Sequence, residues 1–217
     1  MGCGGISHGV FWLTMEHTLF NHLRETLLPL EDAWPGPIAS AVHPQAGVLV
    51  GLTDEAEPRV VLGRRAVHLS LHPGEIAFPG GKREMSDASP WHTAAREARE
   101  EVGLDPKISA ALGRLEPLLT RTGFEVCPCV AVIPADPQLL VDPGEFDSVF
   151  LSRLDIFADK ALYRLEVMSD GTQQRKVPHY QIDDDNIWGV TAAVLALLVN
   201  VAYDAGLDLQ RDWTQTP

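Results

Sequence analysis

Hydrophobic residues recur along this chain at two different spacings, which predict a mixture of helices and strands. Leu19, Phe20, Leu23 and Leu27 fall at helical spacing, so residues 16–30 are predicted to form an amphipathic helix. Short apolar runs predict strands at 48–52, 59–62, 75–78, 110–120 and 126–133. Because strands and helices are mixed along the chain, the pattern favours a layered α/β or α+β fold.

One helix is marked at both of its ends. Ser89 is a natural N-cap, Pro90 suits the first helical position, and Gly103 stands where a glycine C-cap is expected. These signals predict a helix over residues 90–102.

The remaining patterns lie in the last third of the chain. Residues 148–157 suit a short strand or a helical turn. Asp170-Gly171 indicates the turn of a hairpin whose strands cover 163–167 and 176–181. A last helix is predicted over 190–203.

The length of 217 residues suits one domain, and no repeat, low-complexity tract or linker divides it. We expect this domain to cover residues 15–205. Residues 1–14 are expected to be a disordered or non-native start, with Met15 as the alternative first residue. Residues 206–217 are expected to form a polar tail.

The charge balance narrows the range of partners. The chain has 17 basic and 30 acidic residues, a formal net charge of -13. Nucleic acids and anionic membranes are bound through Lys and Arg, so we expect neither as a partner. If the protein handles phosphates, bound divalent cations are the obvious local source of positive charge.

Two further features predict a cytoplasmic protein. No signal-peptide pattern is present, and the longest apolar run, residues 190–199, is too short to span a bilayer. Cys3, Cys127 and Cys129 are interpreted as reduced thiols, since their number and spacing suit neither disulfides nor a zinc site.

The helix predicted over 90–102 carries a group of carboxylates. Glu97, Glu100 and Glu101 occupy positions i, i+3 and i+4, so all three project from one face. Three like charges repel each other unless a cation lies among them, and hard oxygen donors of this kind suit Mg²⁺ or Mn²⁺. Taken alone, such a run is more often a solvated helix face.

The loop before this helix adds a second signal. Phe78-Pro79-Gly80-Gly81 is a glycine-rich approach whose backbone groups can reach a metal or a phosphate. Five residues separate Gly81 from Asp87, and eight more lead to Arg96-Glu97-Ala98-Arg99-Glu100-Glu101-Val102-Gly103-Leu104. This spacing resembles the Nudix box. The usual box has Glu at the position of Asp87 and seven residues before the Arg, and both departures resemble the coenzyme A pyrophosphatase branch.

Two more stretches resemble that branch. Residues 65–81, Arg65-Ala66-Val67-His68-Leu69-Ser70-Leu71-His72-Pro73-Gly74-Glu75-Ile76-Ala77-Phe78-Pro79-Gly80-Gly81, resemble the coenzyme A signature, and Ile187-Trp188-Gly189-Val190-Thr191-Ala192 resembles the C-terminal segment. The resemblance covers about residues 48–203. Ser70 stands where the signature has an Arg; if that Arg contacts a substrate phosphate, either affinity is reduced or Arg64 or Arg65 replaces it.

The resemblance implies a Nudix-type α/β/α sandwich around a mixed β-sheet, and metal-dependent hydrolysis of coenzyme A to 3′,5′-ADP and 4′-phosphopantetheine. It implies metal binding through Mg²⁺ or Mn²⁺ ligands at Glu97, Glu101, Glu100 and the Gly81 carbonyl. Arg96 would orient Glu97 while pairing with Asp87. Glu97 is the first candidate for the general base, and Glu145, on a later loop, is the second.

The expected substrate contacts are Arg64, Arg65, His68, His72 and Gly80, although the two histidines suit a surface or loop-bracing role equally well. Trp188 is interpreted as a core anchor rather than a pocket wall, and Asp183-Asp184-Asp185 as a solvated turn. A monomer and a homodimer both remain open.

Two other functions compete with this interpretation. A Nudix hydrolase of another substrate, such as a nucleotide sugar, ADP-ribose or a dinucleotide polyphosphate, is favoured by Ser70. A non-catalytic Nudix-fold binding module is opposed by the intact set of Glu97, Glu100 and Glu101.

Overall fold

The computed structural model describes residues 18–38, 41–169 and 174–209. A helix over residues 18–26 comes first. The elements that follow are β1 (Gln45–Thr53), β2 (Arg59–Arg65), β3 (Ile76–Ala77), β4 (Gly80–Lys82), α2 (Pro90–Val102), the 3-10 helix η2 (Pro106–Ile108), β5 (Ala110–Arg114), β6 (Leu118–Leu119), β7 (Glu125–Ile133), β8 (Phe146–Arg153), the 3-10 helix η3 (Asp155–Ala158), β9 (Tyr163–Ser169), β10 (Gln174–Ile182), β11 (Asp185–Trp188) and α3 (Gly189–Tyr203).

The main sheet is mixed and has β1 at its centre. β1 runs parallel to β7, with pairs from Gln45↔Glu125 to Thr53↔Ile133. It is antiparallel to β2 and β4. The strand order is β3-β2-β1-β7-β5, and β8 lies beside β2. The long parallel pairing places the start of β1, and with it β4, directly under α2.

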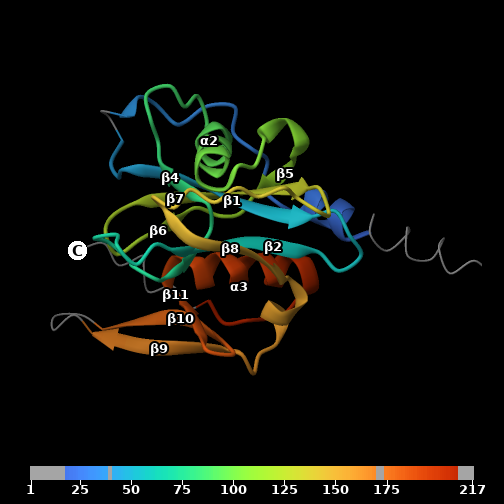
Figure 1. The fold of residues 1–217 in the computed structure, drawn as a ribbon. Coiled ribbons are helices and arrows are strands. Elements are labelled where there is room, and N and C mark those ends of the chain that lie inside the picture. Colours follow the sequence, from blue (N-terminus) through green and yellow to red (C-terminus); the bar gives the residue numbers. More distant parts are fainter. Residues whose placement is uncertain (1–17, 39–40, 170–173, 210–217) are drawn as a thin grey trace, which may run out of the picture.

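Alternate side chains of the central strands enter two cores on opposite faces of this sheet. Leu49 and Cys129 pack with Ala98 of α2 on one face. Val50 and Val130 enter the other core, which α3 fills. Figure 1 shows the resulting layers, with α2 above the sheet and α3 below it. The predicted α/β/α sandwich around a mixed sheet is therefore confirmed.

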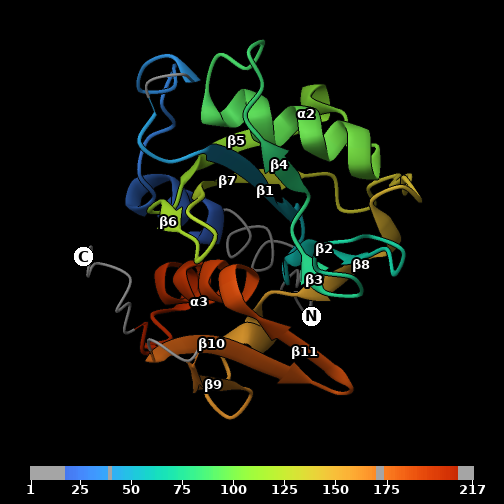
Figure 2. The same cartoon turned by 90° about the vertical axis from the view of Figure 1, so that its left-hand side faces the viewer.

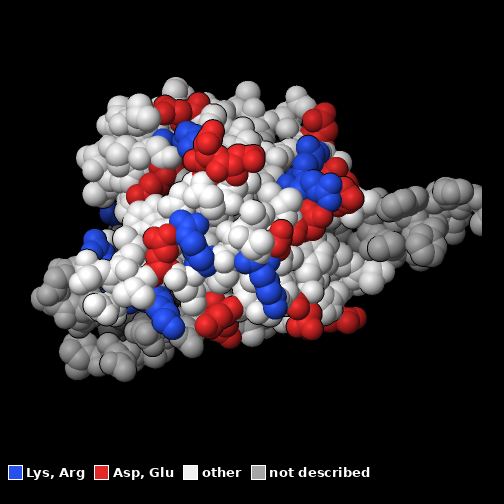
Figure 3. Space-filling view, turned by 90° about the horizontal axis from the view of Figure 1, so that it is seen from below, with Lys and Arg blue, Asp and Glu red and all other residues white. Residues whose placement is uncertain are grey.

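A second, antiparallel sheet of order β11-β10-β9 lies on the far side of α3 (Figure 1). Its inner face is anchored by Tyr180, whose ring packs edge-on against Phe157 with centroids 5.2 Å apart. The Tyr180 hydroxyl donates to the Phe157 carbonyl oxygen at 2.9 Å. Viewed from below, this side of the molecule carries basic and acidic groups close together (Figure 3). Within β9, the Arg164 Nε atom lies 2.6 Å from Glu166 Oε1.

The helix with the clearest sequence signals has the predicted ends. The Ser89 hydroxyl accepts a hydrogen bond from the His92 amide at 3.3 Å, and Pro90 begins α2. Gly103 follows the last turn with φ 70°, a left-handed conformation in which its amide reaches the carbonyls of Ala98 and Arg99.

Several elements differ from their predicted bounds. The first helix is described only over 18–26, because Leu28 leaves it to bridge Arg114. The run 110–120 is divided into β5 and β6, which Pro117 separates; proline has no amide hydrogen for a strand ladder. The short strand predicted at 75–78 is reduced to β3, and the chain pairs again as β4.

The region from 146 to 188 contains one strand more than predicted. Residues 148–157 form most of β8 followed by η3. The predicted hairpin strands are confirmed as β9 and β10, while the turn at Asp170-Gly171 lies outside the described residues. Asp183 and Asp184 form a turn as predicted, but Asp185 begins β11, which pairs with β10.

The ends of the chain are only partly described. Residues 1–14, Met15, Cys3 and 210–217 lie outside the described residues. Within the predicted tail, Leu207 is buried and packs in the core beside α3. Cys127 and Cys129 are free, buried thiols. None of the described helices has the length and apolar character needed to cross a membrane.

Candidate active site

Two carboxylates of α2 lie against the glycine turn that begins β4. The Glu101 Oε2 atom accepts a hydrogen bond from the Gly80 amide at 2.8 Å, and Glu101 is only 5% exposed. A Cβ atom added at Gly81 would overlap the carboxylate of Glu97. The absence of a side chain at Gly81 therefore leaves room for the Glu97 carboxylate in its present position.

Arg96 holds Glu97 in place while being held itself by Asp87. The Arg96 guanidinium forms a bidentate contact with Asp87, with Nε 3.1 Å from Oδ1 and Nη2 3.0 Å from Oδ2. Nη2 also donates to Glu97 Oε1 at 2.8 Å and to the Lys82 carbonyl at 3.0 Å. This is the Asp87–Arg96–Glu97 geometry that the resemblance implied.

Asp87 is buried and ionised. Burial alone would raise the pKa of Asp87, but hydrogen bonds from Arg96, the Glu84 amide and the Thr93 hydroxyl outweigh it, so that the pKa is lowered. In return, the hydrogen bonds to Asp87 raise the pKa of Arg96 above its ordinary value. Each member of the pair therefore favours the charged form of the other, and Asp87 fixes the direction in which Arg96 points.

The negative charges of Glu97 and Glu101, the carboxylates at the glycine turn, repel one another. Burial raises the pKa of Glu101 to about 8, and the charges of Glu97 and Glu145 add to the shift, against the Gly80 hydrogen bond and the Arg65 charge. Burial also raises the pKa of Glu97, opposed by Arg96. A desolvated group of acidic oxygens beside a backbone turn fits a hard divalent cation, which would relieve this repulsion.

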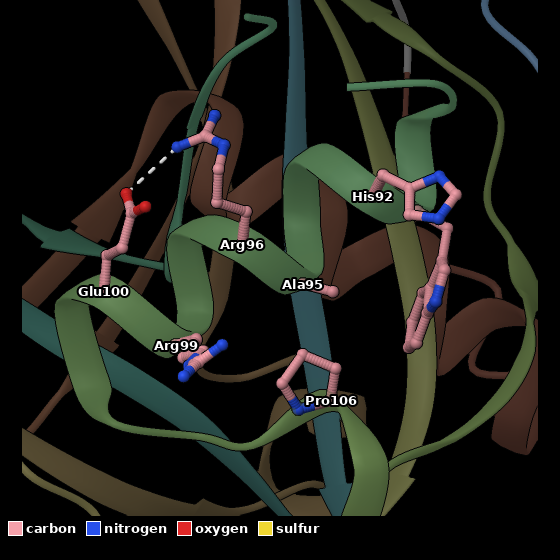
Figure 4. Close-up of a pocket in the computed structure, with 7 residues that line it drawn as sticks. His92, Ala95, Arg96, Arg99, Glu100 and Pro106 are labelled. Atoms are coloured by element: carbon pink, nitrogen blue, oxygen red, sulfur yellow. Dashed lines mark hydrogen bonds and ion pairs between the residues drawn. The ribbon is translucent and has the colours of Figure 1, made fainter. Parts of the chain in front are cut away.

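Glu100 lies on the outer side of α2, away from this turn. Its Oε2 atom is 3.0 Å from Arg96 Nη1, and the side chain is 58% exposed. Figure 4 shows the contact at the edge of a groove of about 590 Å³. This groove is lined by Trp91, His92, Ala95, Arg96, Arg99, Glu100 and Pro106, and includes neither Glu97 nor Glu101.

The predicted set of three glutamate ligands is therefore not assembled. Within the described part of the chain, no three His, Cys, Asp or Glu side chains already surround a common point. Glu97 and Glu101 lie together at the turn, whereas Glu100 is paired with Arg96.

Glu145, the predicted alternative base, lies on a loop attached to the end of α2. The Asp142 amide donates to the Glu101 carbonyl at 2.8 Å, and the Glu145 carbonyl accepts from the Ala66 amide at 2.9 Å. The Glu145 carboxylate is 3.8 Å from Arg65 Nη2. The structure thus brings Glu145, Arg65 and Glu101 into one electrostatic group.

The other residues predicted to contact the substrate are Arg64, His68 and His72, and each has different surroundings. Arg64 is paired with Asp185 of β11 at 2.7 Å. His72 has φ 56°, and its Nδ1 atom is 3.0 Å from Glu75 Oε2, a contact that braces the loop. His68 is exposed on the same loop.

Two contributors to this region were missed by the sequence reasoning. The Thr93 hydroxyl donates to Asp87 at 3.0 Å. Helical spacing alone places Thr93 one turn before Arg96 and Glu97, so this contact has a sequence signal. Asp185 has none, because it is 121 positions from Arg64 along the chain.

Comparisons with known proteins establish the family. The NUDIX domain family matches residues 43–168. The protein named uncharacterized Nudix hydrolase NudL from Yersinia pestis (strain Pestoides F) is 34% identical over 157 residues, which cover 72% of this chain and 78% of the relative. A NudL from Yersinia pseudotuberculosis serotype O:1b matches with the same values.

Among solved structures, a C. elegans Ap4A hydrolase binary complex is 18% identical, with a TM-score of 0.44 and coverage of 51% of this chain and 80% of that one. The chain belongs to the Nudix family of hydrolases, whose members act on nucleoside diphosphate derivatives with divalent metal ions.

Proposed function

We propose that this protein hydrolyses the pyrophosphate bond of coenzyme A, with Mg²⁺ or Mn²⁺, to 3′,5′-ADP and 4′-phosphopantetheine. The observation that carries the proposal is the buried Glu101 and the half-buried Glu97 against the backbone of Gly80 and Gly81. The choice of coenzyme A is supported by the signature-like residues 65–81, which lead directly into this turn.

Glu97, Glu101 and the Gly81 carbonyl would hold the divalent cation, and Glu100, now paired with Arg96, would be a further ligand. A bound divalent cation supplies charge neutralisation on the phosphate oxygens and makes a water easier to deprotonate. Burial of Glu101 and the close approach of Gly81 to Glu97 support this donor set.

The chain's own groups then position and deprotonate the attacking water. Arg96, fixed by Asp87, favours the ionised form of the Glu97 carboxylate and fixes its direction. Glu97 is the first candidate for the base, because it lies at the turn between Arg96 and Gly81. Glu145 is the second, because its charge acts on Glu101.

Binding of the substrate phosphates is assigned to Arg65, with His68 and His72 on the adjoining loop, while the Gly80 amide donates to Glu101. Arg65 is the basic residue whose charge acts on Glu101, so it lies on the same side as the carboxylates. A phosphate that enters this region would compete with Glu145 for the Arg65 guanidinium.

Another nucleoside diphosphate derivative is the second candidate substrate. Ser70 favours it, since the coenzyme A signature has an Arg there, and Arg64 is already paired with Asp185. ADP-ribose and nucleotide sugars share the same pyrophosphate link and would use the same metal site.

Product analysis by mass spectrometry tests the proposal. The purified protein is incubated with coenzyme A, ADP-ribose and a panel of nucleotide sugars, with and without Mg²⁺ or Mn²⁺, beside Glu97→Gln as a matched inactive control. The expected result is metal-dependent release of 3′,5′-ADP and 4′-phosphopantetheine. Cleavage of another compound alone would discard coenzyme A, and no cleavage of any compound would favour a binding module.

A further inference from the structure

Arg64 lies where the two sheets of the molecule meet. Its Nη2 atom is 2.7 Å from Asp185 Oδ1 of β11, and its Nη1 atom donates to the Gly74 carbonyl at 3.4 Å. One side chain of β2 thus joins the loop 66–75 to the β10–β11 hairpin. β3 and β11 contact each other at this junction, and Figure 2 shows β2 and β3 above β11 at the same end of the molecule.

The backbone of Arg65 closes the loop 66–75 through two hydrogen bonds. The Arg65 amide donates to the Glu75 carbonyl at 2.8 Å, and the Gly74 amide donates to the Arg65 carbonyl at 3.0 Å. Gly74 adopts φ 72°, so it forms the turn through which the loop returns toward Gly80. The backbone of Arg65 therefore fixes Gly74 on one side, and the side chain of Arg64 fixes it on the other.

Arg64 and Arg65 have partners on different sides of the chain. Arg65 lies 3.8 Å from Glu145, among the acidic residues near the glycine turn. Arg64 is instead paired with Asp185 of the sheet formed by β9, β10 and β11. Side chains of neighbouring strand residues point to opposite faces, which is consistent with this division. A guanidinium that is bound to Asp185 and Gly74 is not directed at a phosphate beside Glu97.

We infer that Arg64 is a positioning residue: by joining Gly74 to Asp185 it fastens the loop 66–75 to the β10–β11 hairpin and so sets the place of the substrate loop. This inference rests on the proposed function, in which that loop contacts the substrate. The sheet formed by β9, β10 and β11 thereby influences the position of the substrate loop, although it lies outside the α/β/α sandwich. Arg64 and Asp185 are 36% and 37% exposed, so the effect of the pair is modest.

Three variants separate this role from direct phosphate binding: Arg64→Gln, Asp185→Asn and the two combined. Asp155→Asn is the matched control, because Asp155 pairs with Arg153 at the opposite end of the β2–β8 pair. For each protein, kcat and KM are measured with coenzyme A and Mg²⁺. Hydrogen exchange of the backbone amides over 66–76 is measured without substrate.

The expected result is a rise of about two- to fivefold in KM for either single variant, with kcat nearly unchanged. The double variant should be no worse than the more affected single one, because both substitutions break the same link. Amide exchange over 66–76 should be faster in all three variants and unchanged in Asp155→Asn.

Two results would overturn the inference. One is a rise in KM above about tenfold for Arg64→Gln with none for Asp185→Asn, which indicates a direct charge-assisted contact with the substrate. The other is unchanged amide exchange over 66–76 in both single variants. A wild-type protein that leaves coenzyme A intact would refute the proposed function alone, since the exchange measurement needs no substrate.

Discussion

Replacing Glu101 by Gln should make the metal-free protein more stable at alkaline pH. The folded protein raises the pKa of Glu101 from 4.5 to about 8, chiefly by burial. Between these two values the folded carboxyl keeps a proton that the unfolded chain has lost. Its contribution to stability is therefore complete below pH 4.5 and is lost as the pH rises toward 8.

The size of the effect follows from the same pKa. At about 1.36 kcal/mol per pKa unit, the difference corresponds to about 5 kcal/mol at pH 9. Relaxation around the ionised carboxylate reduces this figure, so we expect a gain of about 2–5 kcal/mol for Glu101→Gln. Gln has nearly the same shape, and its carbonyl oxygen can accept the hydrogen bond from the Gly80 amide.

Urea denaturation in EDTA, followed by tryptophan fluorescence from pH 5 to pH 9, measures this gain. The wild-type free energy of unfolding should fall across this range relative to that of Glu101→Gln, and the two should meet near pH 5. Glu100→Gln is the control; Glu100 is 58% exposed, so its profile should follow the wild type. Parallel profiles for Glu101→Gln and the wild type would refute the reasoning.

Divalent metal should narrow the stability difference between the two proteins at alkaline pH. A cation that binds only the folded wild type stabilises it by about 2.7 kcal/mol at one hundred times its dissociation constant. Glu101→Gln lacks the buried charge and should gain little. Equal stabilisation of both proteins by Mg²⁺ or Mn²⁺ would remove Glu101 from the ligand set.

Four further substitutions test other parts of the site. Glu97→Gln should lower kcat by about 10²-fold or more with an unchanged melting temperature, whereas a larger loss in Glu145→Gln would make Glu145 the base. Gly81→Ala should lose most metal-dependent turnover with little change in stability, because its Cβ would displace the flexible Glu97 carboxylate; kinetic and denaturation assays measure both. Asp87→Asn should lower kcat about tenfold with full expression and folding, since Arg96 loses a charged partner; a kcat equal to wild type would contradict this role.

The sequence predicted best what depends on neighbouring residues. The ends of α2 follow from Ser89, Pro90 and Gly103, whose effects act within one helical turn. Helical spacing likewise placed Glu97 and Glu101 on one face, where the structure has them together at the Gly80 turn. Burial of these carboxylates is a property of the packed fold.

What the sequence did not predict depends on distant pairing. The parallel contact of β1 with β7 joins Gln45 to Glu125, and no local pattern specifies it. The acidic run at 183–185 gave no sign of β11. Asp185 has a role only because the fold brings it to Arg64. Glu100 has the spacing of a ligand, and the structure also pairs it with Arg96 one turn away.

The most direct test of the account is hydrolysis of coenzyme A by the wild-type protein in water enriched in oxygen-18, with Mg²⁺ present. Attack of water on phosphorus should give 3′,5′-ADP and 4′-phosphopantetheine in equal amounts, with one solvent oxygen in the phosphate of one of the two. EDTA should abolish both products. Intact coenzyme A, or the same products in the presence of EDTA, would contradict metal-dependent pyrophosphate hydrolysis at Glu97 and Glu101.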